Sequence, residues 1–175
     1  MSDTVSKRRY VLDASIAIVI SNRADAPGLE YAREAGIETR VISHRGFTSR
    51  EDYDRALVKV LKDREVALVC LAGFMRLLSP VMVEAFPNRI LNIHPSLLPK
   101  YPGLHPQQQA LEDGAAVSGA TVHVVNTELD AGPIVLQREV PVLPGDTEET
   151  LAARILQVEH ALYPQAIDAV LKTMR

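Results

Sequence analysis

Short apolar runs alternate with amphipathic segments along this chain, and that alternation limits the possible folds more than any other feature. The runs at 16–20, 40–42, 66–72 and 90–93 are rich in Val, Ile and Leu, and each has the length of a buried strand. Helical spacing of apolar residues separates several of them. This order predicts an α/β fold, in which a mostly parallel, twisted sheet carries helices on both faces.

The helix ends and helix faces are also predicted by particular residues. We expect Asp25 to cap a first helix, and Ser49 with Asp52 to form a capping box for a second helix that reaches about Asp63. Asp146 with Glu149 predicts a capping box for the last helix. The apolar face of the second helix comprises Tyr53, Ala56, Leu57, Val60 and Leu61. That of the last helix comprises Leu151, Ile155, Val158 and Leu162.

The stretch between these helices adds one more helix and two more strands. A helix from about Pro106 should end at Gly114, and segments 120–125 and 133–142 indicate strands. Pro141 cannot donate a hydrogen bond to a neighbouring strand, so the second of these strands is expected to be antiparallel and near an edge. Pro164 is expected to kink the last helix.

Length and composition limit the class of protein. The 175 residues favour one domain, 1–175, and a net charge of −3 argues against a nucleic-acid binder that works through bulk electrostatics. The single cysteine, Cys70, lies in an apolar run and is expected to be buried. No stretch predicts a membrane span or a signal peptide, so the cytoplasm is the expected location.

Polar residues follow two of the predicted strands, at the sheet edge where α/β proteins place their sites. Asn92 and His94 are two residues apart, so an extended backbone directs both side chains to the same side. An amide N–H can stabilise an oxyanion and an imidazole can move protons, which suits acyl transfer. Asp130, in a turn, could support the imidazole. A structural Asn, an exposed His and an ordinary turn Asp remain the alternatives at this point.

Other chemistries have little support in the sequence. The histidines lack the spacing of a local metal site, so we predict none. No Gly-x-Ser-x-Gly nucleophile motif, Walker motif or Gly-x-Gly-x-x-Gly motif is present. Direct attack of a bound amine on a bound acyl donor needs no protein nucleophile.

Four longer stretches, 20–25, 71–80, 92–105 and 119–133, carry a family resemblance. The third reads Asn-Ile-His-Pro-Ser-Leu-Leu-Pro-Lys-Tyr-Pro-Gly-Leu-His. Together they closely resemble the phosphoribosylglycinamide formyltransferases, folate-dependent enzymes of purine synthesis. The resemblance implies a Rossmann-like formyltransferase fold and the transfer of a formyl group from 10-formyltetrahydrofolate to the amine of glycinamide ribonucleotide. It also implies these two small molecules as ligands.

The resemblance implies roles for individual residues. Asn92 would bind the formyl oxygen, His94 would stabilise the oxyanion, and Asp130 would hold His94 and assist proton transfer. The residues implied around the folate are Arg76, Leu77, Leu78, Asn92, Val125, Glu128 and Asp130. Those implied around the ribonucleotide are Gly73, Met75, Pro95 and Glu159, with Arg50 on its phosphate side.

One family feature is absent from the sequence. Members normally begin with an apolar strand and a Gly-x-Gly-Ser-Asn loop that holds the substrate phosphate, whereas segment 16–25 matches the family's second strand. We therefore expect a gap between strands where the missing strand would lie, here called the seam. We also expect weakened phosphate binding, unless a homodimer or Lys7, Arg8 and Arg9 compensate. The alternatives are a related folate-dependent formyl hydrolase or transferase, and a non-catalytic folate-binding protein.

Overall fold

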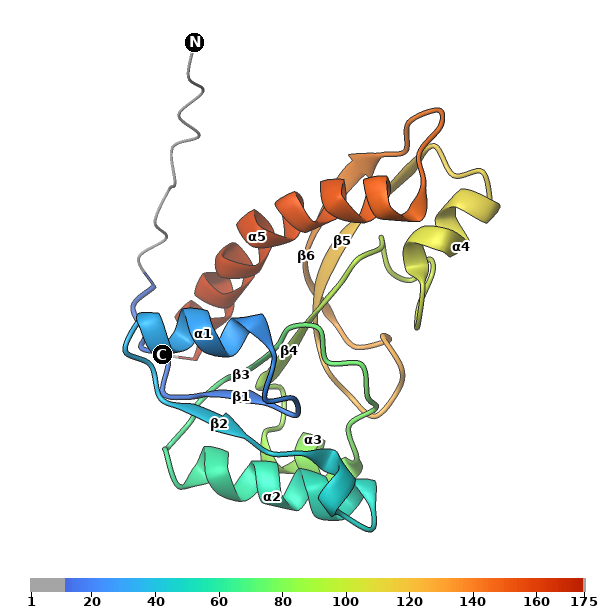
Figure 1. Cartoon of the computed structure of the whole chain (residues 1–175). Helices are drawn as coiled ribbons and strands as arrows, with labels where there is room; N and C mark the ends of the chain where they lie inside the picture. The colour runs from blue at the N-terminus through green and yellow to red at the C-terminus, as the bar shows by residue number, and fades with distance from the viewer. Residues whose placement is uncertain (1–11, 175) are drawn as a thin grey trace.

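The computed structural model describes residues 12–174 and alternates strands with helices (Figure 1). Lys7, Arg8 and Arg9 lie outside the described residues. The elements, in chain order, are β1 (Val19–Ser21), α1 (Pro27–Glu34), β2 (Thr39–Val41), the 3₁₀ turn η1 (His44–Gly46), α2 (Arg50–Lys62), β3 (Val69–Leu71), α3 (Pro80–Ala85), β4 (Ile90–His94), α4 (Pro106–Glu112), β5 (Val117–Val124), β6 (Ile134–Pro141) and α5 (Glu148–Thr173).

The described strands form two separate sheets. β1 and β2 pair in parallel, and the other sheet has the order β3-β4-β5-β6. Within it β3 and β4 are parallel, whereas β5 is antiparallel to both β4 and β6. The break between β1 and β3 is the seam expected from the sequence, and β6 is the antiparallel edge strand predicted from Pro141.

Two apolar cores lie on opposite faces of the larger sheet. Adjacent residues of a strand point to opposite faces, and in β4 Leu91 belongs to one core while Ile90 belongs to the other. The first core packs β5 and β6 against α5, and the second packs β3 against α2 and α3. Figure 1 shows α5 on one side of this sheet and α2 with α3 on the other. The predicted α/β architecture is therefore confirmed.

Helix caps follow the sequence prediction in one case and differ from it in two. Ser49 caps α2, because its hydroxyl accepts a hydrogen bond from the Asp52 N–H. The prediction for Asp25 is wrong: Ala26 is the N-cap residue of α1, and Asp25 pairs instead with Arg23.

The predicted box at the start of α5 is also wrong, by one residue. Thr147 and Thr150 exchange the capping hydrogen bonds there. The Asp146 carboxylate instead binds the Leu143 N–H and the Arg154 guanidinium. α5 continues through Pro164, which lies inside the helix.

The open seam explains the main error about burial. Cys70, predicted to be buried, is exposed, because β3 has no neighbour on its seam side among residues 12–174. Its sulfur lies beside the Tyr163 hydroxyl, and local desolvation raises the pKa of the thiol to about 11.

The helix α3 was not predicted from the sequence. In the described part of the chain, no helix has the length and apolar character needed to cross a membrane.

Candidate functional site

The end of β4 and the facing residue of β5 form the centre of the candidate site. Asn92 and His94 are alternate residues of β4, so they share one face of the sheet. The antiparallel register places His123 of β5 directly opposite Asn92. Asp130, in the loop between β5 and β6, completes the group. The structure thus brings together the three predicted catalytic residues and places His123 beside them.

His94 is held from both ring nitrogens in a buried position. Its side chain is 7% exposed. Nε2 lies 2.9 Å from the carbonyl oxygen of Tyr101, so the Nε2–H donates to that carbonyl. Nδ1 faces the Asp130 Oδ2 atom at 3.5 Å. Since Nε2 is occupied by a backbone acceptor, Nδ1 is the nitrogen that can exchange a proton within the site.

Asn92 is oriented by His123. The Nδ1–H of His123 donates to the Val124 carbonyl at 3.2 Å, which leaves Nε2 as an acceptor for the Asn92 amide at 3.3 Å. One N–H of the Asn92 amide is thereby fixed, and the second remains available to a ligand. The sequence analysis did not assign His123 to the site. The pairing of two strands would have revealed it, but strand register cannot be obtained from residue spacing alone.

Asp130 is a carboxylate that lies between two histidine rings and a backbone N–H. Its Oδ2 atom accepts the Gly103 N–H at 2.9 Å, and its Oδ1 atom lies 3.6 Å from His123 Nε2. Burial by itself raises the pKa of this carboxyl. The neighbouring His123 ring, the hydrogen bond from the Gly103 N–H and the nearby His94 ring together outweigh burial, so the pKa lies below its usual value. Asp130 is therefore ionised at neutral pH and can stabilise a protonated His94.

The turn that carries Asp130 depends on its conformation and on a glycine. Asp130 has a φ of 48°, in the left-handed region that Asp adopts more readily than most residues. At Gly132 a Cβ would overlap the carbonyl oxygen of Val124. The same carbonyl accepts the hydrogen bond from His123. Because Gly132 has no Cβ, the turn can lie against this carbonyl without displacing it from the His123 ring.

A buried threonine of β5 holds the loop after β4 in place. Thr121 is fully buried, donates its hydroxyl proton to the Ser96 carbonyl at 2.7 Å and accepts from the Leu98 N–H at 3.1 Å. Gln137 donates to the same hydroxyl oxygen and to the Leu98 carbonyl. This network holds the loop that supplies the Tyr101 carbonyl and the Gly103 N–H.

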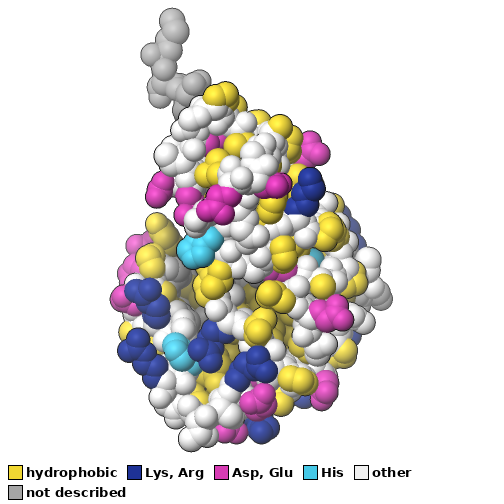
Figure 2. All heavy atoms as spheres, turned by 90° about the vertical axis from the view of Figure 1, so that its right-hand side faces the viewer, with side chains coloured by type: hydrophobic (Ala, Val, Ile, Leu, Met, Phe, Trp, Pro, Cys, Tyr) yellow, Lys and Arg dark blue, Asp and Glu magenta, His cyan; other side chains and the backbone are white. Residues whose placement is uncertain are grey.

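The residues predicted around the folate lie in two environments. Leu78 and Val125 pack against the second core, whereas Leu77 is 54% exposed. The guanidinium of Arg76 lies over the Tyr53 ring at 5.7 Å. Met75, Leu104 and Leu129 are further exposed apolar side chains. Figure 2 shows apolar and basic groups interspersed on one face. Glu128 is exposed in the loop before Asp130.

The residues predicted around the ribonucleotide are less closely grouped. Gly73, with a φ of 64°, follows β3, and Pro95 directly follows His94. Arg50 is the exposed first residue of α2, and its guanidinium lies 3.7 Å from the Glu51 carboxylate. Glu159 lies one helical turn before Tyr163, whose hydroxyl binds the carbonyls of Leu71 and Leu91. Burial raises the pKa of Glu159.

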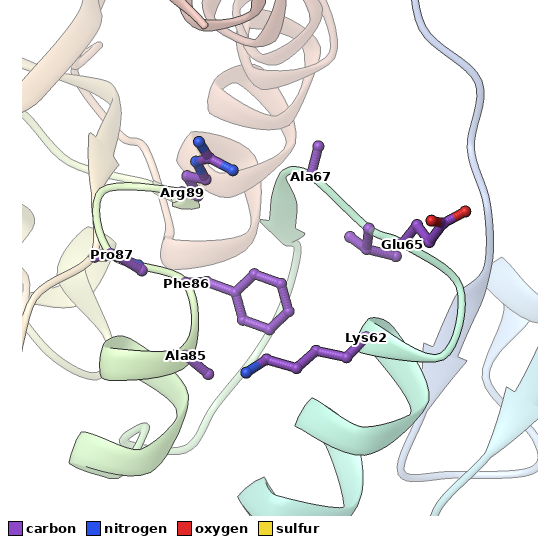
Figure 3. A pocket seen from close by; sticks show the side chains of 8 residues that line it. Lys62, Glu65, Ala67, Ala85, Phe86, Pro87 and Arg89 are labelled. Carbon is purple, nitrogen blue, oxygen red and sulfur yellow. The ribbon is translucent and has the colours of Figure 1, made fainter.

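One cavity lies away from this site. It has a volume of about 590 Å³ and is bounded by the end of α2 and by the segments before β3 and β4. In Figure 3 the Phe86 ring and the Lys62 side chain extend into this space. It lies at the amino-terminal ends of the strands and contains none of the predicted site residues. A second cavity, of about 450 Å³, is lined by residues that follow β1 and β2.

The central group has the composition of an acyl-transfer site. An amide donor, an imidazole and an ionised carboxylate converge without a serine or cysteine nucleophile. Within residues 12–174 no group of three His, Cys, Asp or Glu side chains has the arrangement of a metal site. The chemistry that these residues can supply is stabilisation of an oxyanion and transfer of protons.

Comparisons with known proteins agree with this chemistry. The sequence profile of the formyl transferase family matches residues 3–167. The phosphoribosylglycinamide formyltransferase of Escherichia coli is 51% identical over 156 residues, covering 89% of this chain and 74% of that protein. A trifunctional purine biosynthetic protein of Drosophila pseudoobscura is 54% identical over 154 residues, 88% of this chain, which spans 11% of that longer protein.

Solved structures that are similar to this chain also carry the names of formyl-transferring enzymes. The glycinamide ribonucleotide transformylase 1 of Symbiobacterium toebii superposes with a TM-score of 0.88 at 55% identity, covering 90% of this chain and 74% of that chain. A phosphoribosylglycinamide formyltransferase of Bacillus halodurans superposes with a TM-score of 0.89 at 37% identity, covering 94% of this chain and 84% of that chain.

Proposed function

The chain belongs to the formyl transferase family, and on that premise we propose that it transfers the formyl group of 10-formyltetrahydrofolate to the amine of glycinamide ribonucleotide. The observation that carries this proposal is the convergence of Asn92, His94 and Asp130 in one largely buried group. Its relatives that are named for this reaction support the choice of substrates.

The chemical step is direct attack of the substrate amine on the formyl carbon. The formyl oxygen then takes up negative charge, which the free N–H of Asn92 and a protonated His94 can stabilise. In this role Asn92 is a preset donor, because His123 already fixes its amide plane. Collapse of the tetrahedral intermediate breaks the bond between the formyl carbon and N10 of the folate.

Proton movement follows from the geometry of His94 and Asp130. The amine loses a proton as the new C–N bond forms, and the folate nitrogen gains one as it leaves. His94 Nδ1 and the Asp130 carboxylate, 3.5 Å apart, are the groups placed to accept and return this proton. The lowered pKa of Asp130 keeps it ionised, so its charge can stabilise the positive charge that the imidazole acquires when it accepts the proton.

The remaining contacts of the substrates are part of the same proposal. Arg76, Leu77, Leu78, Val125 and Glu128 would line the folate site, and Gly73, Met75, Pro95, Glu159 and Arg50 would surround the ribonucleotide. The exposed Met75 and Leu77 side chains supply apolar surface for such ligands. We expect the enzyme to act in the cytoplasm, without a metal ion, and a homodimer remains a further expectation.

Product analysis tests this function against hydrolysis. Purified protein is incubated with 10-formyltetrahydrofolate with and without glycinamide ribonucleotide, and formylated ribonucleotide and free formate are measured separately. We expect formylated ribonucleotide only when the amine is present. Release of formate at the same rate without the amine would identify a hydrolase.

The non-catalytic alternative is distinguished by binding. A folate analogue should bind saturably whether or not the protein turns over. Saturable binding together with an absence of both products would identify a folate-binding protein that lacks catalysis.

A further inference from the structure

The cavity of about 450 Å³ at the ends of β1 and β2 contains polar groups that the proposed chemistry leaves unused. Six residues line it: Asn22, Arg23, Asp25, Ser43, His44 and Arg45. It lies at the carboxyl-terminal ends of a parallel strand pair, where α/β folds place ligands. Its position in the fold therefore favours a binding site.

The charge of this cavity is positive. Arg23 and Asp25 neutralise each other, because the guanidinium binds both carboxylate oxygens at 3.0 and 2.7 Å. Arg45 is exposed, and no acidic side chain in the described part of the chain pairs with it. One unpaired guanidinium thus remains in the cavity, without a competing carboxylate.

Uncharged donors surround this cation. The Asn22 amide donates to His44 Nδ1 at 3.1 Å, which leaves the ring proton of a neutral His44 on Nε2 as a donor. The Ser43 oxygen accepts the Arg45 N–H at 3.4 Å, so its hydroxyl proton is available. A guanidinium, an imidazole N–H, a hydroxyl and an amide are a suitable donor set for a compact oxyanion.

An aromatic contact connects the cavity to the proposed folate site. His44 contacts Tyr53 edge to face with ring centroids 6.3 Å apart, and Arg76 lies over the same Tyr53 ring. Tyr53 therefore lies between the cavity and Arg76. Figure 2 shows basic side chains gathered around a histidine beside a hollow on this face.

We infer that this cavity is an oxyanion subsite, in which Arg45, His44, Ser43 and Asn22 hold an anionic group of a substrate. The inference rests on the proposed function for the identity of that substrate. The phosphate of the ribonucleotide is the expected occupant, since it is compact and doubly charged. The carboxylates of the folate's glutamate tail share the same chemistry and are the other source.

Inorganic phosphate is the probe for the subsite itself. Phosphate is titrated into the full chain while backbone amide resonances are followed by NMR. We expect saturable shifts at residues 43–46, and binding at least about tenfold weaker in Arg45→Ala. Arg33→Ala is the matched control, because Arg33 is exposed on α1 and pairs with Glu30. Shifts that do not saturate, or that persist unchanged in Arg45→Ala, would overturn the subsite.

Kinetics then distinguish the two sources. A higher KM for glycinamide ribonucleotide in Arg45→Ala, with an unchanged KM for the folate, identifies the phosphate. A higher KM only for a folate with several glutamates identifies the tail. If neither KM changes, the assignment to a substrate is wrong. Phosphate binding in a wild-type protein without turnover would leave the subsite standing and would instead contradict the proposed function.

Discussion

At the scale of single residues, the least expected feature is the dependence of Asn92 on His123. An amide that must meet a developing oxyanion loses effectiveness if its plane rotates, and the hydrogen bond at 3.3 Å fixes that plane. His123 in turn is fixed by the Val124 carbonyl. We therefore propose that His123 is a positioning residue that acts through Asn92.

His123→Ala should lower kcat for formyl transfer about tenfold to a hundredfold, because small losses of alignment are costly in such sites. The KM for the folate should change little. The readout is a double-mutant cycle with Asn92→Ala. If His123 acts through Asn92, its substitution has little further effect in the Asn92→Ala background. Additive losses in kcat would contradict this role.

The sequence predicted part of this site and missed part of it. Asn92 and His94 were predictable as neighbours because they lie two apart on one strand. Asp130 was connected to them only by the family resemblance, since 36 residues of chain separate it from His94. His123, the Tyr101 carbonyl and the Gly103 N–H depend on strand register and loop conformation, which no local pattern encodes.

At the scale of elements, the loop between β4 and α4 is the piece whose conformation the site most requires. Thr121→Val removes the hydroxyl that satisfies the Ser96 carbonyl and the Leu98 N–H. Since these groups are left without their partner, the free energy of unfolding should fall by about 2 kcal/mol. Chemical denaturation measures this change. Thr127→Val, at an exposed position, is the control, and an equal loss in both variants would contradict the role of Thr121.

The start of α5 is stabilised by an ion pair that should depend on pH. The Arg154 hydrogen bonds, with the Leu143 N–H, hold the pKa of Asp146 well below its usual value. A lowered folded-state pKa stabilises the fold above the unfolded pKa of about 3.9, and that stabilisation is lost as pH falls through the folded value. Asp146→Asn should therefore be less stable than wild type at pH 7, and the difference should shrink below about pH 4.

Thermal unfolding of wild type and Asp146→Asn across pH 2–7 checks this expectation. Asp168→Asn is the matched control, because Asp168 forms only an exposed helical pair with Lys172. A stability difference that stays constant to the lowest pH would show that the Asp146 charge is not its cause.

Helix prediction succeeded where local side chains determine the end of the helix. Ser49 and the face formed by Tyr53, Leu57 and Val60 were predictable because a cap and a 3.6-residue period are local features. Asp25 and Asp146 were misassigned because each carboxylate has an arginine partner that competes for it. The six-residue helix α3 is too short to produce a periodic signal.

At the scale of the whole molecule, the seam between the two sheets is the main departure from a continuous α/β sheet. Main-chain groups of alternate residues point to opposite sides of a strand. The Val19 N–H binds the Glu38 carbonyl and the Val69 N–H binds the Arg89 carbonyl. The N–H groups of Ile20 and Cys70 therefore face the seam, and within residues 12–174 neither has a main-chain partner.

Hydrogen exchange should detect the open seam. The amides of Ile20 and Cys70 should exchange faster, by orders of magnitude, than those of their neighbours Val19 and Val69. Each pair serves as its own control, since both residues share one strand. Equal protection of Cys70 and Val69 in native-state exchange would mean that another segment fills the seam.

The sequence predicted the seam from a missing strand, but the exposure of Cys70 became evident only with the strand order.

The central claim, that Asn92, His94 and Asp130 act together in formyl transfer, is tested most directly by one rate. Formyl transfer from 10-formyltetrahydrofolate to glycinamide ribonucleotide is measured for wild type and His94→Ala, with His160→Ala, exposed on α5, as the matched control. We predict turnover in wild type and His160→Ala, and a loss of about a hundredfold or more in His94→Ala. No turnover in the folded wild-type protein, or undiminished turnover in His94→Ala, would contradict the claim.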